Sequence, residues 1–278
     1  METIINGFKT NRAFAVTSVL VLCLLLIAIA APVIAPYDPT HAVMKDAFLE
    51  PCAQHLFGTD KLGRDCFSRV LYGARASLSG VLFLVASVFI VGTSMGVISG
   101  YFGGKVDMVI MRISDMMISF PGMILAIAVA GIMGGSLVNA VIALTIVSWT
   151  KYARLSRSLV LQIKSRDYVE AAIVNGGTSP HILWVHILPN ILPMMVITAA
   201  ADIGALMMEL ASLSFLGFGS QPPAPEWGLM LNEGRQQLQT APWLMVFPGL
   251  AIFVTVVIFN LWGDNLRDVL DPRNDVQD

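Results

Sequence analysis

The stretch Ser77–Ser99, SLSGVLFLVASVFIVGTSMGVIS, contains no charged residue. A transmembrane helix needs roughly 20 mostly apolar residues, because about 30 Å of hydrocarbon must be crossed at about 1.5 Å per residue. The stretch therefore predicts a membrane-spanning helix. Gly92 and Gly96, with Gly100 and Gly104 just beyond, recur every four residues and so share one helix face. This face is expected to let a neighbouring helix approach closely.

Working outward from this stretch, the rest of the chain contains further apolar runs of similar length. Four are long enough to span: Ala13–Ala31, Met116–Gly134, Ile191–Leu213 and Leu244–Trp262. A shorter run, Leu137–Trp149, reaches spanning length only when Ser136 and the Thr150–Ala153 end are included. We predict an all-α, polytopic membrane protein with six spans, in which one N-terminal helix precedes a core of five helices.

The composition agrees with a multi-pass membrane protein. Of 278 residues, 56% are hydrophobic and 13% are charged, whereas about a quarter of the residues of a soluble domain are charged. The net charge of −2 provides no basic field for nucleic acid. We therefore expect membrane lipid, and not nucleic acid, to surround this chain.

An even number of spans places both termini on one side of the membrane. Most Lys and Arg residues fall inside when both termini are cytoplasmic, which favours an N-in, C-in topology. The predicted organisation is then a cytoplasmic N-terminus with the first span (1–36), an extracytoplasmic segment (37–76), a core (77–262) with a cytoplasmic loop (151–189), and a cytoplasmic tail (263–278).

The extracytoplasmic segment is expected to fold on the membrane surface, with Asp65–Leu78 as an interfacial helix. Cys52, His55 and Cys66 lie in or just beside this part of the chain and are soft metal ligands by type, but their spacing fits no closed site. We expect no metal site here. A Cys52–Cys66 disulfide stays open as an alternative.

Gly92–Gly96 is formally the G-x-S-x-G of serine hydrolases, with Ser94 in the nucleophile position. That motif requires a strand-to-helix turn, whereas here it lies inside a continuous apolar run. We therefore predict a packing role, no catalytic residue and no enzymatic activity.

Asp202 and Glu209 are acidic residues well inside a predicted span, seven positions apart and so on nearly the same helix face. Charges at this depth are costly and usually face a bundle interior or a water-filled path. Both residues are candidates for the wall of a translocation path. A structural ion pair between helices, with Arg112 as one candidate partner, is the alternative.

The loop at 151–189 is far more polar than its surroundings. Arg166–Val174 is expected to form a helix that Asn175-Gly176-Gly177 terminates, because glycine readily adopts positive φ. Ser179 and Pro180 should cap and start a second helix, and Pro189 should end it before the membrane is re-entered. The predicted product is a rigid helix-turn-helix that docks on another protein.

This loop resembles the EAA loop of ATP-binding-cassette (ABC) importer permeases, E-A-A-x3-G-x9-I-x-L-P. The matching residues are Glu170, Ala171, Ala172, Gly176, Leu188 and Pro189, while His186 replaces the isoleucine. Further segments are similar to the dipeptide, oligopeptide and nickel branch of these permeases: Gly58–Asp65, Asp107–Pro121, Ser214–Gly217, Pro225–Gly228 and Gly263–Pro272. The single span before a five-span core resembles the C subunit of that branch.

The resemblance implies a set of partners. Such permeases are one half of a pair, served by a paralogous second permease, two cytoplasmic ATP-binding subunits and an extracytoplasmic substrate-binding protein. Glu170–Pro189 would then be the coupling segment on an ATP-binding subunit. The chain lacks G-x-x-x-x-G-K-[ST], so we expect it to bind no cofactor and to leave ATP and magnesium to its partners.

The segment after the fifth span, Gly217–Trp243, would face the binding protein, with Pro222, Pro223, Glu226 and Trp227 as the candidate contacts. The substrate is left open between di- or oligopeptides and nickel or a metal complex, with a slight lean to nickel from the Trp149–Val160 and Asp202–Met207 stretches. A secondary transporter or channel that works without ATP-binding subunits is the rival interpretation.

Overall fold

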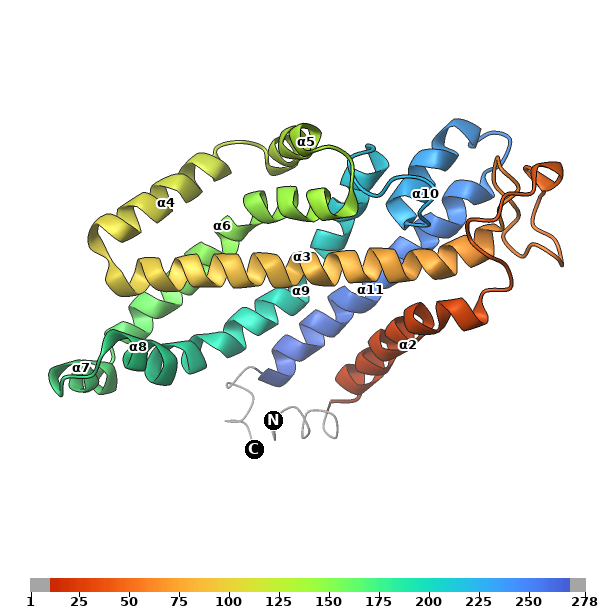
Figure 1. Cartoon of the computed structure of the whole chain (residues 1–278). Coiled ribbons are helices and arrows are strands. Elements are labelled where there is room, and N and C mark those ends of the chain that lie inside the picture. Colours follow the sequence, from red (N-terminus) through yellow and green to blue (C-terminus); the bar gives the residue numbers. More distant parts are fainter. Residues whose placement is uncertain (1–10, 271–278) are drawn as a thin grey trace.

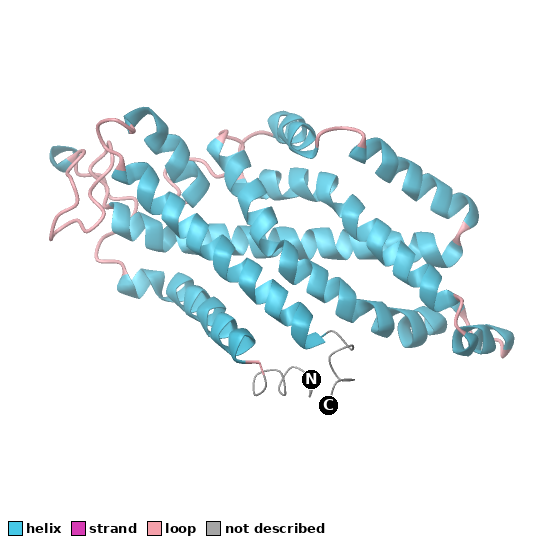
Figure 2. Cartoon of the chain, turned by 180° about the vertical axis from the view of Figure 1, so that it is seen from behind, coloured by secondary structure: helices cyan, strands magenta, loops and turns pink. Residues whose placement is uncertain are grey.

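The computed structural model describes residues 11–270, and its regular structure within that range is helical, apart from an isolated bridge between Thr59 and Asp65 (Figure 1, Figure 2). The helices are α2 (Arg12–Ile34), η1 (Met44–Asp46), α3 (Cys66–Phe102), α4 (Gly104–Ile118), α5 (Gly122–Met133), α6 (Leu137–Lys164), α7 (Asp167–Val174), α8 (Ser179–Ile182), η2 (Leu183–Ile187), α9 (Leu188–Phe215), α10 (Trp227–Gly234), η3 (Arg235–Gln237) and α11 (Trp243–Leu270).

Four helices in the described part of the chain are long and apolar enough to cross a membrane: α2, α3, the continuous helix Ser179–Phe215, and α11. They confirm four of the predicted spans. The total of six stays a prediction, because a fifth span depends on counting α4 and α5 together. α6 has 28 residues, but Lys151, Arg154 and Arg157 lower the hydropathy of its second half.

The predicted interfacial helix at Asp65–Leu78 is wrong, because this segment is the first part of α3. Asp65 caps the helix by accepting a hydrogen bond from the Ser68 backbone N–H at 2.7 Å. From Cys66 the helix continues for 37 residues without interruption. Gly73, the one glycine in its first three turns, serves packing, since a Cβ there would lie 2.6 Å from the Trp227 ring.

The predicted span Met116–Gly134 is also wrong as a single helix. α4 ends at Ile118, α5 begins at Gly122, and the two helices are bent by 96°. Pro121 contributes to the break, because its ring and its missing N–H disfavour the interior of a helix. α5 alone is 12 residues long, which is about 18 Å and short of the bilayer core.

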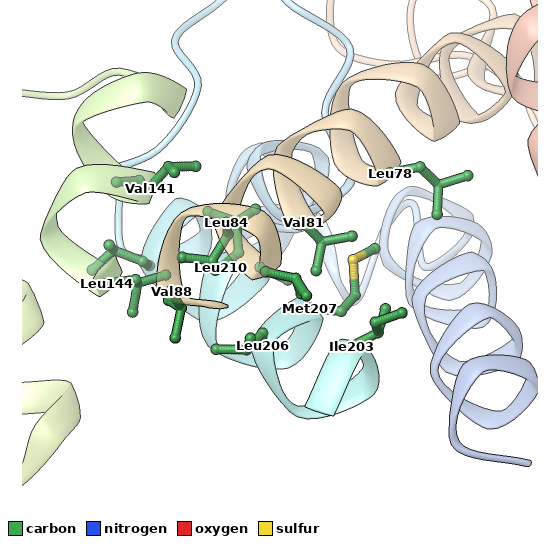
Figure 3. Close-up of a cluster of buried hydrophobic side chains, with 14 of the residues drawn as sticks. Leu78, Val81, Leu84, Val88, Val141, Leu144, Ile203, Leu206, Met207 and Leu210 are labelled. Carbon is green, nitrogen blue, oxygen red and sulfur yellow. The ribbon is translucent and has the colours of Figure 1, made fainter. Parts of the chain in front are cut away.

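The core lies where α3, α6 and α9 meet (Figure 3). All three helices contribute buried side chains to this core. The labelled members are Leu78, Val81, Leu84, Val88, Val141, Leu144, Ile203, Leu206, Met207 and Leu210. Because these apolar residues are contributed by helices far apart in sequence, their burial fixes the order of the bundle.

The glycine stripe brings α3 and α6 into close contact, as predicted. An added Cβ at Gly92 would lie 2.5 Å from the Trp149 carbonyl oxygen, and at Gly100 it would lie 2.9 Å from Val160 Cβ. Gly104 is the exception. It starts α4 with φ +54° and has no neighbour within 4 Å of a Cβ position.

The two ends of the molecule differ. The segment between α2 and α3 lies with α10 at one end, and α7 and α8 lie at the other, toward which the start of α2 and the end of α11 also point (Figure 1, Figure 2). The 151–189 loop thus shares a side with both ends of the described chain. The predicted tail differs in part, since α11 continues to Leu270; residues 1–10 and 271–278 lie outside the described residues.

Candidate functional site

The first half of the predicted coupling segment is formed as expected. α7 spans Asp167–Val174, and Gly176 follows it with φ +80°. The Gly176 N–H donates to Ile173 O and the Gly177 N–H donates to Ala172 O, both at 3.0 Å. These two bonds form a Schellman motif, which needs a residue with positive φ at the Gly176 position.

The second half differs from the prediction at both ends. Thr178, not Ser179, is the N-cap residue of α8. Pro189 does not end the helix, because α8 passes through a π-helical turn, η2, directly into α9. The Leu188 N–H donates to Leu183 O, five residues back. This wider turn lies just before Pro189, whose ring would otherwise clash with the carbonyl group four residues earlier.

The tip of this segment presents a large apolar and aromatic surface. Val174 is 86% exposed and Trp184 is 72% exposed. We call this surface the loop tip and define it as Tyr168, Ile173, Val174, Trp184 and Val185, all of them exposed. Glu170 and Ala171 are also exposed, beside the tip. Exposed apolar surface of this kind marks an interaction site.

Beneath the loop tip, buried side chains fix the segment to the bundle. Val169, Ile182 and Ile187 pack in one cluster with Tyr101 of α3 and Val160 of α6. Among the other predicted coupling residues, Ala172, His186 and Leu188 are half-buried and Pro189 is exposed. The His186 ring lies against the Tyr168 and His181 rings, at centroid distances of 6.1 and 5.9 Å.

Asp202 and Glu209 line one cavity of about 330 Å³ between α6, α9 and the α4–α5 break. The partner of Asp202 is Lys151, not Arg112: Lys151 Nζ lies 2.7 Å from each carboxylate oxygen. Lys151 is near the middle of α6 and Asp202 is near the middle of α9. The structural alternative, an ion pair between helices, is thus present with a different partner, and the pair faces a cavity; a role in a translocation path stays a prediction.

Two further ion pairs join α4 to α6 and were missed by sequence reasoning. Arg157 Nη2 donates to Asp107 Oδ2 at 2.6 Å, and Arg154 Nη2 donates to Asp115 Oδ1 at 2.5 Å. Asp107 and Asp115 are eight positions apart on α4 and Arg154 and Arg157 are three positions apart on α6, so the sequence signal was one acidic and one basic helix face. These pairs fix α4 relative to the helix that carries Lys151.

The predicted binding-protein contacts Glu226 and Trp227 are buried instead, at 1% and 3% exposure. Glu226 caps α10 by accepting hydrogen bonds from the Gly228 and Leu229 backbone N–H groups. Its burial raises the pKa of its carboxyl group. The Trp227 ring N–H donates to Val70 O at 2.9 Å. Glu226 and Trp227 therefore anchor the segment, and of the four predicted contacts Pro222 and Pro223 are the two that are exposed.

Another feature that the sequence did not reveal is a buried charge cluster at the outer end. Arg64 and Arg69 are 2% and 1% exposed. Both contact Asp60 and Glu233 within salt-bridge distance. The Gly58–Asp65 stretch, which was noted only for its resemblance, contributes Asp60 and Arg64 to this cluster. The cluster joins α3 to α10 through Arg69 and Glu233.

The cysteines of the outer segment are free thiols, so the Cys52–Cys66 bridge is not formed. Cys66 is buried against Trp243 and Leu244, and Cys52 is exposed. His55 contacts Asp65 at 2.9 Å. Within residues 11–270 no group of three or more His, Cys, Asp or Glu side chains is arranged to hold a metal ion.

Comparison with known proteins identifies the family that has these features. Residues 92–276 match the binding-protein-dependent transport system inner membrane component, and residues 3–51 match the N-terminal transmembrane domain of oligopeptide transport permease C. The chain belongs to this family of binding-protein-dependent transport permeases.

Individual relatives cover nearly the whole chain. The dipeptide transport system permease protein DppC of Alkalihalophilus pseudofirmus is 43% identical over 95% of this chain and 87% of its own length. The glutathione transport system permease protein GsiD of Pectobacterium atrosepticum is 44% identical over 96% and 89%. The inward-facing MetNI methionine ABC transporter matches in fold, with a TM-score of 0.60 and 20% identity, over 73% of this chain and 97% of that one.

These findings confirm that the permease is a non-catalytic, multi-pass subunit of an ABC importer in the inner membrane, whose ATPase is a separate subunit. They also confirm the resemblance to the peptide-permease C type. The rival interpretation, a transporter that works without ATP-binding subunits, has no support in this family.

Proposed function

We propose that this permease forms half of the translocation path of an importer for short peptides and docks through its loop tip on a cytoplasmic ATP-binding subunit. The observation that carries the docking is the exposure of Val174 and Trp184 on a segment whose other side is packed on the bundle. Hydrophobic and aromatic anchors of this kind contribute most of the free energy at protein interfaces.

The packing beneath the loop tip gives docking a mechanical consequence. Ile182 and Ile187 contact the cluster that contains Val97 and Val160, so a displacement of the tip moves α3 and α6 directly. Ser179–Phe215 is also one helix, which extends the same displacement to Asp202. Closure of the ATP-binding subunits would thus be converted into movement around the cavity.

The proposed partners are a second permease, two ATP-binding subunits and an extracytoplasmic binding protein. The α4–α5 pair offers an exposed apolar surface for the second permease; its members include Val109, Ile113, Phe120, Ile124 and Ile132. Pro222 and Pro223, which are exposed, are the proposed contacts for the binding protein.

Short peptides are the substrate class that the relatives favour. The two quoted above are named for dipeptide and for glutathione transport, and glutathione is itself a tripeptide. The sequence lean toward nickel rested on two short stretches of this chain, and the relatives do not strengthen it. We therefore propose peptides of two or three residues.

Uptake in a strain that lacks only this chain tests the proposal. Plasmid-borne permease should restore uptake of labelled L-alanyl-L-alanine and should co-purify, in mild detergent, with an ATP-binding subunit and a second permease. Val174→Asp should abolish uptake and the co-purified ATP-binding subunit, while Lys105→Asp, at an exposed site outside the loop tip, should preserve both. Restoration of nickel uptake without dialanine uptake would refute the substrate class.

A further inference from the structure

The cavity at the α4–α5 break contains charges of both signs, and two of them, Lys151 and Asp202, lie near the middle of their helices. Its lining includes Lys151 from α6, and Asp202 and Glu209 from α9. An ionised group placed in the hydrocarbon region costs several kcal/mol unless it is paired or hydrated. Three such groups around one cavity, beyond what a single structural ion pair needs, indicate a site for a charged ligand.

One side of the cavity suits an anion. The Lys151 side chain is 61% exposed although it pairs with Asp202, so part of its ammonium group faces open space. α5 begins at Gly122, which also lines the cavity, and no side chain caps the start of α5. The first N–H groups of a helix are free donors at the positive end of its dipole, and they attract carboxylates.

The other side of the cavity suits a cation. Asp202 and Glu209 both line it, and Asp202 is the one that pairs with Lys151. An ammonium group of a ligand would therefore meet two carboxylates on this side. The cavity volume of about 330 Å³ lies at the small end of ligand sites, about 300–1,000 Å³, and so favours a small solute.

We propose, resting on the peptide-permease function above, that this cavity is a binding site for both free termini of a short zwitterionic peptide. Lys151 and the start of α5 receive the C-terminal carboxylate, and Asp202 with Glu209 receives the N-terminal ammonium group. When the site is empty, Lys151 and Asp202 neutralise each other. When a peptide enters, each exchanges its partner for a terminus, so neither of these two charges is left unpaired in the membrane.

The exchange of partners also explains why the pair lies at the centre of both helices rather than at an interface with water. An ion pair that served only to join α6 to α9 would cost less near the membrane surface. The Arg154–Asp115 pair is a contrast within the same protein. It joins α6 to α4, and neither of its residues lines the cavity.

Binding to the assembled transporter, without its binding protein, tests the site. The probe is labelled L-alanyl-L-alanine, with N-acetyl-dialanine and dialanine amide as competitors. For the wild-type complex we expect each blocked peptide to compete at least tenfold less well than dialanine. We call the factor by which a blocked peptide competes less well than dialanine its penalty. For Asp202→Asn the penalty of N-acetyl-dialanine should fall below threefold, while that of dialanine amide stays tenfold. For Lys151→Met the penalty of dialanine amide should fall below threefold, while that of N-acetyl-dialanine stays tenfold.

Two controls keep the result decisive. Arg154→Gln should preserve both penalties, and Lys151→Met combined with Asp202→Asn, which leaves no unpaired charge, should assemble and lose both. Unchanged penalties in the assembled single variants, or equal losses of both penalties in each, would overturn the site. If wild-type cells fail to import dialanine at all, the proposed function fails first; if they import it and the penalties do not respond, only the site fails.

Discussion

Arg69 Nη2 donates to Glu233 Oε2 at 2.8 Å and so joins the first turn of α3 to the end of α10, 164 positions later in the chain. The same guanidinium group donates to the carbonyl oxygens of Pro39 and Pro223. Four segments distant in sequence thus meet at one buried side chain. The outer end of the permease is therefore held together by polar bonds as well as by apolar packing.

Glu233→Gln should destabilise this end strongly. Arg64 and Arg69 would then share the single carboxylate of Asp60, and an incompletely neutralised buried charge costs about 3–5 kcal/mol. We expect a lower midpoint in thermal unfolding of the purified permease. Lys61→Gln, at an exposed residue beside the same cluster, is the matched control and should change little. Equal midpoints for both variants would show that the cluster is not structural.

Gly96→Ala should disrupt the contact between α3 and α6. A Cβ at this position would lie 1.9 Å from Ser156 Oγ and 2.1 Å from Ala153 O. The serine hydroxyl can rotate away, but the backbone oxygen cannot, so the helices must separate at a cost of about 1–3 kcal/mol. The yield of monodisperse protein and its unfolding midpoint measure this effect.

The control for Gly96 also tests the G-x-S-x-G motif. Ser94 is exposed on another face of the continuous helix α3. Ser94→Ala should leave both the unfolding midpoint and peptide uptake unchanged. Loss of activity in a stably folded Ser94→Ala variant would instead argue for a chemical role of the hydroxyl group.

Much of the fold could be predicted from local patterns alone. Apolar length predicts α2 and α11, because the bilayer sets the minimum length of a span. The four-residue glycine spacing predicts the α3–α6 contact, and Asn175-Gly176-Gly177 predicts the end of α7, since positive φ has few other solutions. In each case a single physical constraint acts within one continuous segment of the chain.

The remaining features depend on tertiary structure. Pro121 and Pro189 are both next to apolar helical sequence. At Pro121 the helix is broken and α4 and α5 are bent by 96°, whereas at Pro189 the helix continues after a π turn. The proline itself does not distinguish these outcomes; the packing of Ile187 against Tyr101 and Val160 does. Likewise Lys151 could have paired with any acidic residue, and only the packing of α6 on α9 selects Asp202.

Gly176→Val should uncouple ATP hydrolysis from transport. Gly176 has φ +80° and no neighbour that a Cβ would meet, so the cost is backbone strain alone, about 1–3 kcal/mol for a β-branched residue. Relief of that strain moves the turn after α7 and with it the loop tip. We expect uptake to fall at least fivefold while the protein still inserts.

Gly176→Asn is the matched control, because asparagine tolerates the left-handed region better than other non-glycine residues. It should retain most of the uptake. The ratio of peptide transported to ATP hydrolysed, measured in proteoliposomes with the complete transporter, separates uncoupling from simple loss of protein. Equal ratios in the valine and asparagine variants would show that the turn does not transmit motion.

Pro189→Ala should stabilise the helix and impair transport at the same time. Alanine restores the missing N–H and removes the ring, so the π turn at Leu183–Ile187 can revert to regular α-helix with a gain of about 1 kcal/mol. Reversion rotates the loop tip relative to α9, because a π turn contains one residue more than an α turn. Amide hydrogen exchange across the turn should slow, and uptake should fall several-fold.

Pro193→Ala is the control, because this other proline inside α9 lies beyond the turn. It should leave uptake near the wild-type value. Slower exchange with full transport in Pro189→Ala would show that the π turn is not needed for coupling.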